Sequence, residues 1–143
     1  MNRALPQLAE YLCRERGMRL TSWRRRVLGI IASASQPLGA YDILRELRVA
    51  RPDTAPVTVY RALDFLLAQG FVHKLGSLHA YIGCDHPNHP HAGQFLVCRD
   101  CGRVEEIADR VILRSIDRAA GHSGFQARDG LVEIRGRCRA CSR

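Results

Sequence analysis

The sequence predicts an α+β protein with a helical first half and a smaller, mixed second half. Apolar residues recur at helical spacing through roughly the first 70 positions, and short apolar runs bounded by glycine follow them. Two C-x-x-C pairs stand in the second half, a pattern typical of a metal-bound unit. We therefore expect domains at residues 1–83 and 94–143, joined by a hinge at 84–93 rich in proline, histidine and asparagine.

Four helices are predicted in the first domain, each from helical spacing and a start or stop signal. Thr21 can cap the second helix by accepting a backbone hydrogen bond, Pro56 suits the first turn of the fourth, and Gly70 suits its end. The predicted helices cover 4–14, the region from Thr21 to Pro37, 40–50 with Tyr41, Leu44 and Leu47 on one side, and 56 to Gly70.

Strand patterns follow these helices. Residues 71–75 and 80–82 flank a Gly-Ser turn, so helices followed by a hairpin predict a winged helix-turn-helix. In the second domain we expect strands at 94–97 and 104–107. A helix at 109–120 should follow, stopped by Gly121 and with Ile112, Leu113, Ile116 and Ala120 turned inward. Asp129-Gly130 predicts a tight hairpin between 125–128 and 131–135.

The composition limits the class of protein. Twenty-two basic residues against 14 acidic ones give a net charge of +8, which favours a nucleic-acid partner. Lys74 is the only lysine, so the arginine excess can equally reflect the composition of the source genome. No apolar run approaches the roughly 20 residues of a membrane span, and residues 1–17 lack a secretory pattern. We expect a cytoplasmic protein with no membrane partner.

Cys98, Cys101, Cys138 and Cys141 form the two C-x-x-C pairs. Two residues between thiols allow a tight knuckle to aim both sulfurs at one ion, and two knuckles complete a tetrahedral thiolate shell that suits zinc. Because protein fills all four positions, the site should be closed and structural. The alternative is a redox C-x-x-C, but two pairs in one small domain are better explained by one metal.

A second metal site is predicted around the hinge. His73, Cys84, His86, His89 and His91 fall in a short window that spans the wing and the hinge, and glutamates follow the first knuckle. A mixed nitrogen, sulfur and oxygen set can bind zinc. The alternative is a solvated polar loop, and spacing does not decide which histidines would ligate. The candidates are His73, Cys84, His86, His89, His91, Glu105 and Glu106.

The helix from Pro56 has a polar face opposite its apolar one. Residues near the N-terminus of a recognition helix reach base edges, and this face carries Thr58, Tyr60, Arg61 and Asp64. Arg61 can bond a guanine, while Arg19, Arg24, Arg25 and Arg26 can contact phosphates. The alternative is an ordinary surface, but the predicted wing favours DNA.

Several segments together resemble the ferric uptake regulator superfamily, and within it the zinc uptake regulator branch. They are Arg19-Leu20-Thr21, Thr58-Val59-Tyr60-Arg61-Ala62-Leu63-Asp64-Phe65-Leu66, Gly70-Phe71-Val72-His73-Lys74 and Cys98-x-x-Cys101-Gly102. The resemblance implies a homodimeric repressor with a winged-helix domain and an α/β dimerisation domain. Zinc would be its corepressor, two ions per protomer, and pseudo-palindromic operators of zinc-uptake genes its targets.

The resemblance also implies roles for particular residues. It assigns a regulatory zinc to His73, Cys84, His91 and Glu106, and DNA contacts to Tyr41, Tyr60 and Arg61. Pro37 and Phe95 stand roughly where iron-sensing members carry histidines, which argues against ferrous iron. Ser22 and Trp23 replace the usual Pro-Gln of the second helix.

Two other functions would use parts of the same sequence pattern. A sensor of iron or peroxide would use the same fold with a different second metal. A zinc hydrolase or thiol oxidoreductase would need an open metal position or a reactive thiol in a cleft. The sequence has no H-E-x-x-H, no serine elbow and no phosphate-binding glycine loop, so we expect no enzyme.

Overall fold

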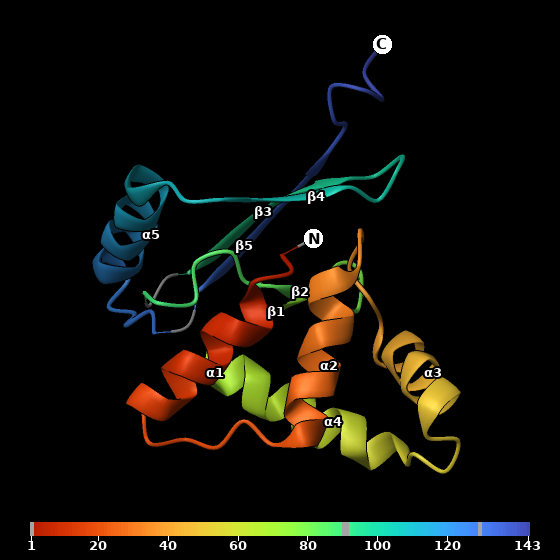
Figure 1. Ribbon diagram of the computed structural model, residues 1–143. Coiled ribbons are helices and arrows are strands. Elements are labelled where there is room, and N and C mark those ends of the chain that lie inside the picture. Colours follow the sequence, from red (N-terminus) through yellow and green to blue (C-terminus); the bar gives the residue numbers. More distant parts are fainter. Residues whose placement is uncertain (1, 90–91, 129) are drawn as a thin grey trace. The chain divides into compact units, whose positions relative to one another are not determined.

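The computed structural model describes residues 2–89, 92–128 and 130–143, and the chain divides into two compact units, Met1–Pro90 and His91–Arg143 (Figure 1). The α+β prediction is confirmed. No helix in the described part of the chain is long and apolar enough to cross a membrane. The elements in order are α1 (Leu5–Glu15), α2 (Ser22–Ser33), α3 (Ala40–Ala50), α4 (Pro56–Ala68), β1 (Val72–Leu75), β2 (Ala80–Gly83), β3 (Gly93–Cys98), β4 (Val104–Ile107), α5 (Arg110–His122) and β5 (Leu131–Gly136).

The helix ends of the first unit follow from local signals. The Thr21 side chain accepts a hydrogen bond from the Arg24 N–H at 3.4 Å and so caps α2, as predicted. Gly70 adopts a φ of +73°, a conformation that glycine enters without steric cost. The Phe71 N–H can then donate to the Leu66 carbonyl at 2.9 Å, which closes α4.

The core of the first unit forms where α2 packs against α1, α3 and α4 (Figure 1). Its buried side chains come from one face of each helix and from the start of the wing. Val27 and Ile31 of α2 are buried, as their spacing predicts. On α3, Leu44 and Leu47 of the predicted apolar side are buried together with Ile43, whereas the Tyr41 side chain is 73% exposed.

The wing is an antiparallel pair of β1 and β2, with Val72 opposite Gly83 and His73 opposite Ile82. An isolated bridge adds Leu38 to the outer side, where Leu38 and Tyr81 exchange both backbone hydrogen bonds. This completes the predicted winged helix-turn-helix.

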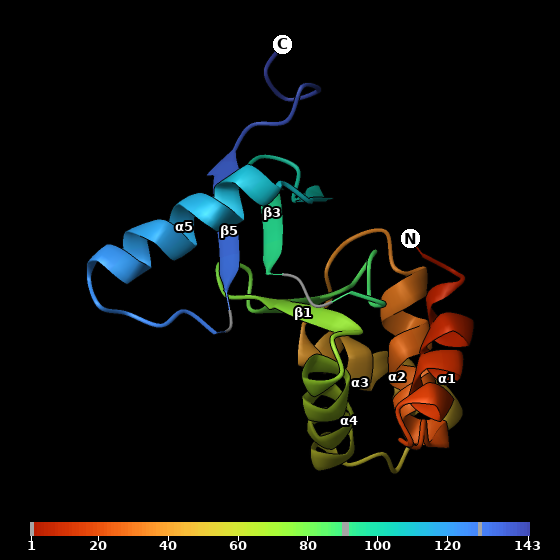
Figure 2. The same cartoon turned by 90° about the vertical axis from the view of Figure 1, so that its left-hand side faces the viewer.

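The second unit is built on a three-stranded sheet of order β4-β3-β5, in which β3 and β5 run side by side and parallel (Figure 2). The predicted hairpin around residues 129–130 is wrong. Residues 125–128 form no strand, and β5 pairs with β3. A Cβ on Gly130 would lie 3.2 Å from the Ala92 Cβ, so this glycine permits a close approach of two segments. Asp129 lies outside the described residues.

Helix α5 is capped by the Asp109 side chain, which accepts from the Val111 N–H at 2.7 Å. It continues past Gly121, contrary to the prediction, because the positive φ that ends a helix occurs at Gly124. Within one chain the predicted inward face is partly covered: Ile112, Leu113 and Ala120 are half-buried, whereas Ile116 is 41% exposed and no residue of α5 is fully buried.

Candidate metal centres and nucleic-acid interface

Parallel pairing of β3 and β5 brings the two C-x-x-C knuckles together. Cys98 ends β3 and is the register partner of Gly136, which ends β5 two residues before Cys138. Each knuckle is a tight turn: the Gly102 N–H donates to the Cys98 carbonyl at 3.1 Å, and the Cys141 N–H donates to the Cys138 carbonyl at 3.0 Å. Parallel strands end at the same edge of a sheet, so both turns present their thiols to one point.

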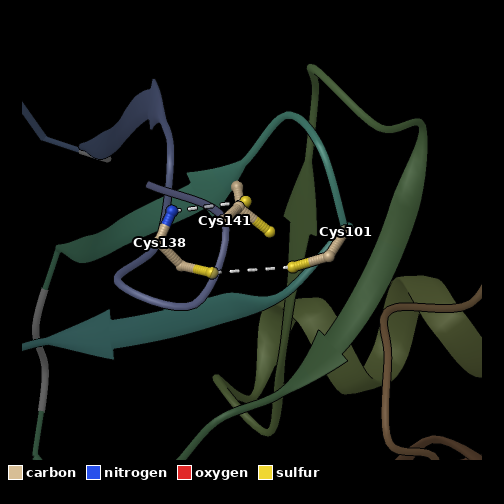
Figure 3. Close-up of side chains that lie close together, drawn as sticks. Cys101, Cys138 and Cys141 are labelled. Atoms are coloured by element: carbon tan, nitrogen blue, oxygen red, sulfur yellow. Dashed lines mark hydrogen bonds between the residues drawn. The ribbon is translucent and has the colours of Figure 1, made fainter. Parts of the chain in front are cut away.

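The four sulfurs of Cys98, Cys101, Cys138 and Cys141 all lie within 4.8 Å of one another. The Cys101 and Cys138 sulfurs are 3.7 Å apart, and the labelled side chains turn toward each other (Figure 3). A tetrahedral zinc–thiolate site requires sulfur–sulfur separations of about 3.8 Å. No described cysteine forms a disulfide. This geometry fits a single tetrathiolate ion and favours it over two separate redox pairs.

The thiols of this cluster differ in acidity. The Cys138 N–H donates to the Cys98 sulfur at 3.3 Å, and with other backbone donors it lowers the pKa of Cys98 to about 6. Hydrogen bonding with neighbouring thiols, Cys138 first, raises the pKa of Cys141 to about 12. Four thiolates therefore coexist here only when a cation offsets their charge, which is the property of a metal site.

His73 and Cys84 form a second pair of potential ligands in the first unit. His73 lies on β1 and Cys84 directly follows β2, where its N–H donates to the Phe71 carbonyl at 2.9 Å. A ring nitrogen of His73 lies within 4.8 Å of the Cys84 sulfur, and the Cys84 side chain is fully buried. The His86 N–H donates to that sulfur at 3.4 Å, a contact that favours a thiolate.

The other predicted ligands of this second site are not all part of the first unit. Glu106 lies on β4 opposite Phe95, in the second unit. His91 lies outside the described residues. The side chains of His86 and His89 are exposed.

The predicted DNA-contacting residues share a surface of the first unit. Tyr41 of α3 and Tyr60 of α4 line one shallow groove between these helices. Tyr60 and Arg61 are exposed on the same turn of α4, and Thr58 is half-buried before them. Neutral ring edges beside a cation can read bases and phosphates in a DNA groove.

Two of the arginines predicted to contact phosphates have partners within the chain. The Arg24 guanidinium stacks 3.6 Å from the centre of the Phe65 ring and donates to the Arg19 carbonyl at 2.6 Å. Arg25 forms an ion pair with Glu10, and this contact lowers the pKa of the Glu10 carboxyl. Arg24 thus joins the first turn of α2 to α4, and Arg25 joins α2 to α1.

Comparison with known proteins gives the family. A sequence model of the ferric uptake regulator family matches residues 15–135, which include the first pair of cysteines and end before Cys138. The chain belongs to the ferric uptake regulator family. This agrees with the resemblance expected from the recognition helix and the first knuckle.

Zinc-linked members of the family are similar over nearly the whole chain. The zinc uptake regulation protein of Escherichia coli K12 is 41% identical over 136 residues, which cover 93% of this chain and 78% of the relative. A solved structure of a zinc uptake regulator complexed with zinc and DNA has a TM-score of 0.92 at 40% identity, covering 96% and 93% of the two chains. A holo structure of the regulator XcZur has a TM-score of 0.91 at 42% identity, covering 98% of each chain.

Within this family fold, two features were missed from the sequence. One is the backbone N–H donation to the Cys84 and Cys98 sulfurs, which no spacing rule reveals. The other is Arg16, whose guanidinium donates to the carbonyls of Gln69 and Pro87. The sequence did offer one sign of this role: Arg16 stands just before Gly17, at the end of a predicted helix, where a cation can reach carbonyls left free by the helix.

Proposed function

We propose that this chain is a zinc-responsive transcriptional repressor. It binds pseudo-palindromic operators of zinc-uptake genes as a homodimer, with zinc as corepressor, and it acts by binding rather than by catalysis. The observation that carries the proposal is the buried Cys84 thiol beside His73 on the wing that directly follows helix α4. Similarity to a zinc uptake regulator complexed with zinc and DNA supports it.

Cys98, Cys101, Cys138 and Cys141 are proposed to hold one structural zinc per protomer. Their sulfurs already lie at tetrahedral spacing, and protein occupies every position, so no site is open for a substrate. Bound zinc there stabilises the folded state, because the unfolded chain offers no preformed site. The four side chains tie the end of β3 to the end of β5.

His73, Cys84, His91 and Glu106 are proposed to hold the second, regulatory zinc. The thiolate and imidazole ligands favour zinc over harder cations. His73 and Cys84 come from the first unit, and Glu106 belongs to the second. Ligands drawn from both units and from the hinge at 84–93 would restrict the motion of one unit against the other. A switch of this kind carries about 1–3 kcal/mol of coupling or more.

Tyr41, Thr58, Tyr60 and Arg61 are proposed to contact DNA. In a symmetric dimer, two copies of α4 bind successive major grooves only when they are about 34 Å apart. Restricting the hinge would set that distance. The exposed apolar side chains of the second unit, including Val111, Ile134 and Phe125, suit burial against a second copy.

The test is a zinc titration of DNA binding with wild type and Cys84→Ser. The probe is a duplex with an A·T-rich pseudo-palindrome from upstream of a zinc-import gene of the same genome, and a scrambled duplex is the control. Wild type should bind the probe only when zinc is added. Cys84→Ser should stay a folded dimer, retain the four-cysteine metal, lose one zinc per chain and lose zinc-dependent binding. Zinc-dependent binding by Cys84→Ser would refute the assignment of the switch.

Metal analysis separates the rival sensor. Protein purified without oxygen and measured for metal content should carry zinc at both sites. Iron in the site that Cys84→Ser abolishes would overturn zinc as the signal while leaving a DNA-binding regulator.

A further inference from the structure

Arg16 joins three parts of the first unit that are far apart in sequence. It is the C-terminal cap residue of α1, where Gly17 turns the chain with a φ of +64°. Its guanidinium donates to the Gln69 carbonyl at 2.8 Å and to the Pro87 carbonyl at 3.0 Å. It also lies 5.3 Å from the centre of the Phe71 ring.

Each of these partners stands next to a functional element. Gln69 is the C-terminal cap of α4, the helix with the proposed DNA contacts. Pro87 is buried and lies three residues after Cys84. Phe71 is fully buried, and its carbonyl accepts the Cys84 N–H at 2.9 Å. The residue that stacks near Phe71 therefore also holds the segment that carries the proposed sensor cysteine.

The start of α1 supports the same segment. A Cβ on Gly83 would lie 2.9 Å from the Leu5 Cδ2, so α1 packs directly on the backbone before Cys84. The Asn2 side-chain amide donates to the Asp85 carboxylate at 3.5 Å. The segment 83–87 thus contacts both ends of α1, through Leu5 in its first turn and through Arg16 at its C-terminal cap.

The geometry points to Arg16 as a positioning residue for the sensor cysteine. It holds residues 84–87 to the C-terminal end of α4, and with them the Cys84 sulfur beside His73. The inference rests on the proposed function for the role of Cys84, whereas the placement of Cys84 follows from the contacts of Arg16 alone. An arginine suits the task because its planar fork can reach two carbonyls at once, whereas a lysine ammonium offers one compact charge.

Alkylation of Cys84 tests the placement without any DNA or regulatory zinc. Full-length protein that retains only the four-cysteine metal is treated with a thiol reagent, and labelling is followed by peptide mass spectrometry. A fully buried thiol reacts only when its surroundings open locally. Losing the two charged hydrogen bonds of Arg16 should speed labelling of Cys84 by about tenfold in Arg16→Ala. Arg16→Lys should fall between Arg16→Ala and wild type.

Two internal controls sharpen this experiment. Cys13 is buried in α1 one turn before Arg16, so a general loosening of the helix would speed its labelling too. Arg14→Ala removes a neighbouring exposed cation of the same helix. Cys13 labelling should not speed up in any variant, because burial raises the pKa of Cys13, the nearby Arg16 charge partly offsets this rise, and removing that charge can only slow this thiol. Arg14→Ala should match wild type at Cys84. Equal Cys84 rates in wild type and both Arg16 variants, or parallel rises at Cys13 and Cys84, would overturn the inference.

A zinc titration connects the placement to regulation. Arg16→Ala should need about tenfold more free zinc for half-maximal DNA binding, with unchanged DNA affinity at saturating zinc. If Arg16→Ala lost DNA affinity at saturating zinc and showed no shift in the zinc midpoint, the inference about Arg16 would also be overturned. If wild type shows no zinc-dependent binding, the proposed function fails, and the alkylation result still decides the placement of Cys84.

Discussion

Replacing Cys138 by serine removes one sulfur from the four-cysteine cluster and should unfold the second unit selectively. Among the described residues of the second unit, the buried apolar side chains are Phe95, Val97 and Cys98. Burial of one such side chain contributes about 1.5–3 kcal/mol. A structural zinc site contributes on the order of 10 kcal/mol. The metal is therefore the larger stabilising contribution to this unit.

The first unit has a much larger core of its own, built by four helices and the wing. It contains none of the four cysteines of the cluster, so it should remain folded in Cys138→Ser. The expected result is loss of protection in β3, β4 and β5 with retained protection in α2 and α4. The same pattern should follow removal of zinc from wild type by a strong chelator.

Hydrogen exchange of the full-length chain, followed by mass spectrometry, measures this difference segment by segment. Cys13→Ser is the matched control, because it replaces a buried cysteine of the first unit and leaves the cluster intact. Uniform loss of protection across both units would show that they unfold as one. Full protection of β3 and β5 in Cys138→Ser would show that the metal does not stabilise the sheet. Either outcome refutes the reasoning.

Two further predictions concern single residues and their controls. Arg61→Ala should weaken operator binding by about 1–3 kcal/mol and relax the preference for particular bases. Arg26→Ala, which removes a predicted phosphate contact, should weaken binding to operator and scrambled duplexes alike. Gel-shift titrations with both duplexes measure the difference. Gly70→Ala should lower the free energy of unfolding by about 1–2 kcal/mol, because φ at this position is +73°. In the control Gly29→Ala, the added methyl group meets open space on α2. This change should raise the free energy of unfolding by roughly 0.5–1 kcal/mol, as denaturant melts can measure.

Much of the first unit was predictable because its signals are local. Helix α3 spans the expected residues, and α4 begins at Pro56 as predicted. A cap, a proline or a glycine acts within one turn, so sequence order alone reveals it. Helical spacing puts Tyr41 on the same side of α3 as Leu44 and Leu47, but it does not say how far that side is covered, and the Tyr41 ring is exposed in the groove beside α4.

The second unit was predicted less well because its contacts are remote. Asp129-Gly130 is a good local turn signal, yet β5 pairs with β3 across more than thirty residues of intervening chain. Strand pairing depends on which surfaces bury each other, and a dipeptide does not encode that. The apolar face of α5 was correctly predicted from its spacing, but within one chain it is only half-buried.

The sequence by itself determined the metal knuckles and the recognition helix. Two residues between thiols restrict each C-x-x-C to a tight turn, and Pro56 and Gly70 bound α4, since both effects act over a few bonds. Only the tertiary structure decided that the two knuckles meet, through the parallel register of Cys98 with Gly136. It also decided that Cys84 is buried beside His73 and held by Arg16, because such contacts depend on the packing of separate elements rather than on spacing along the chain.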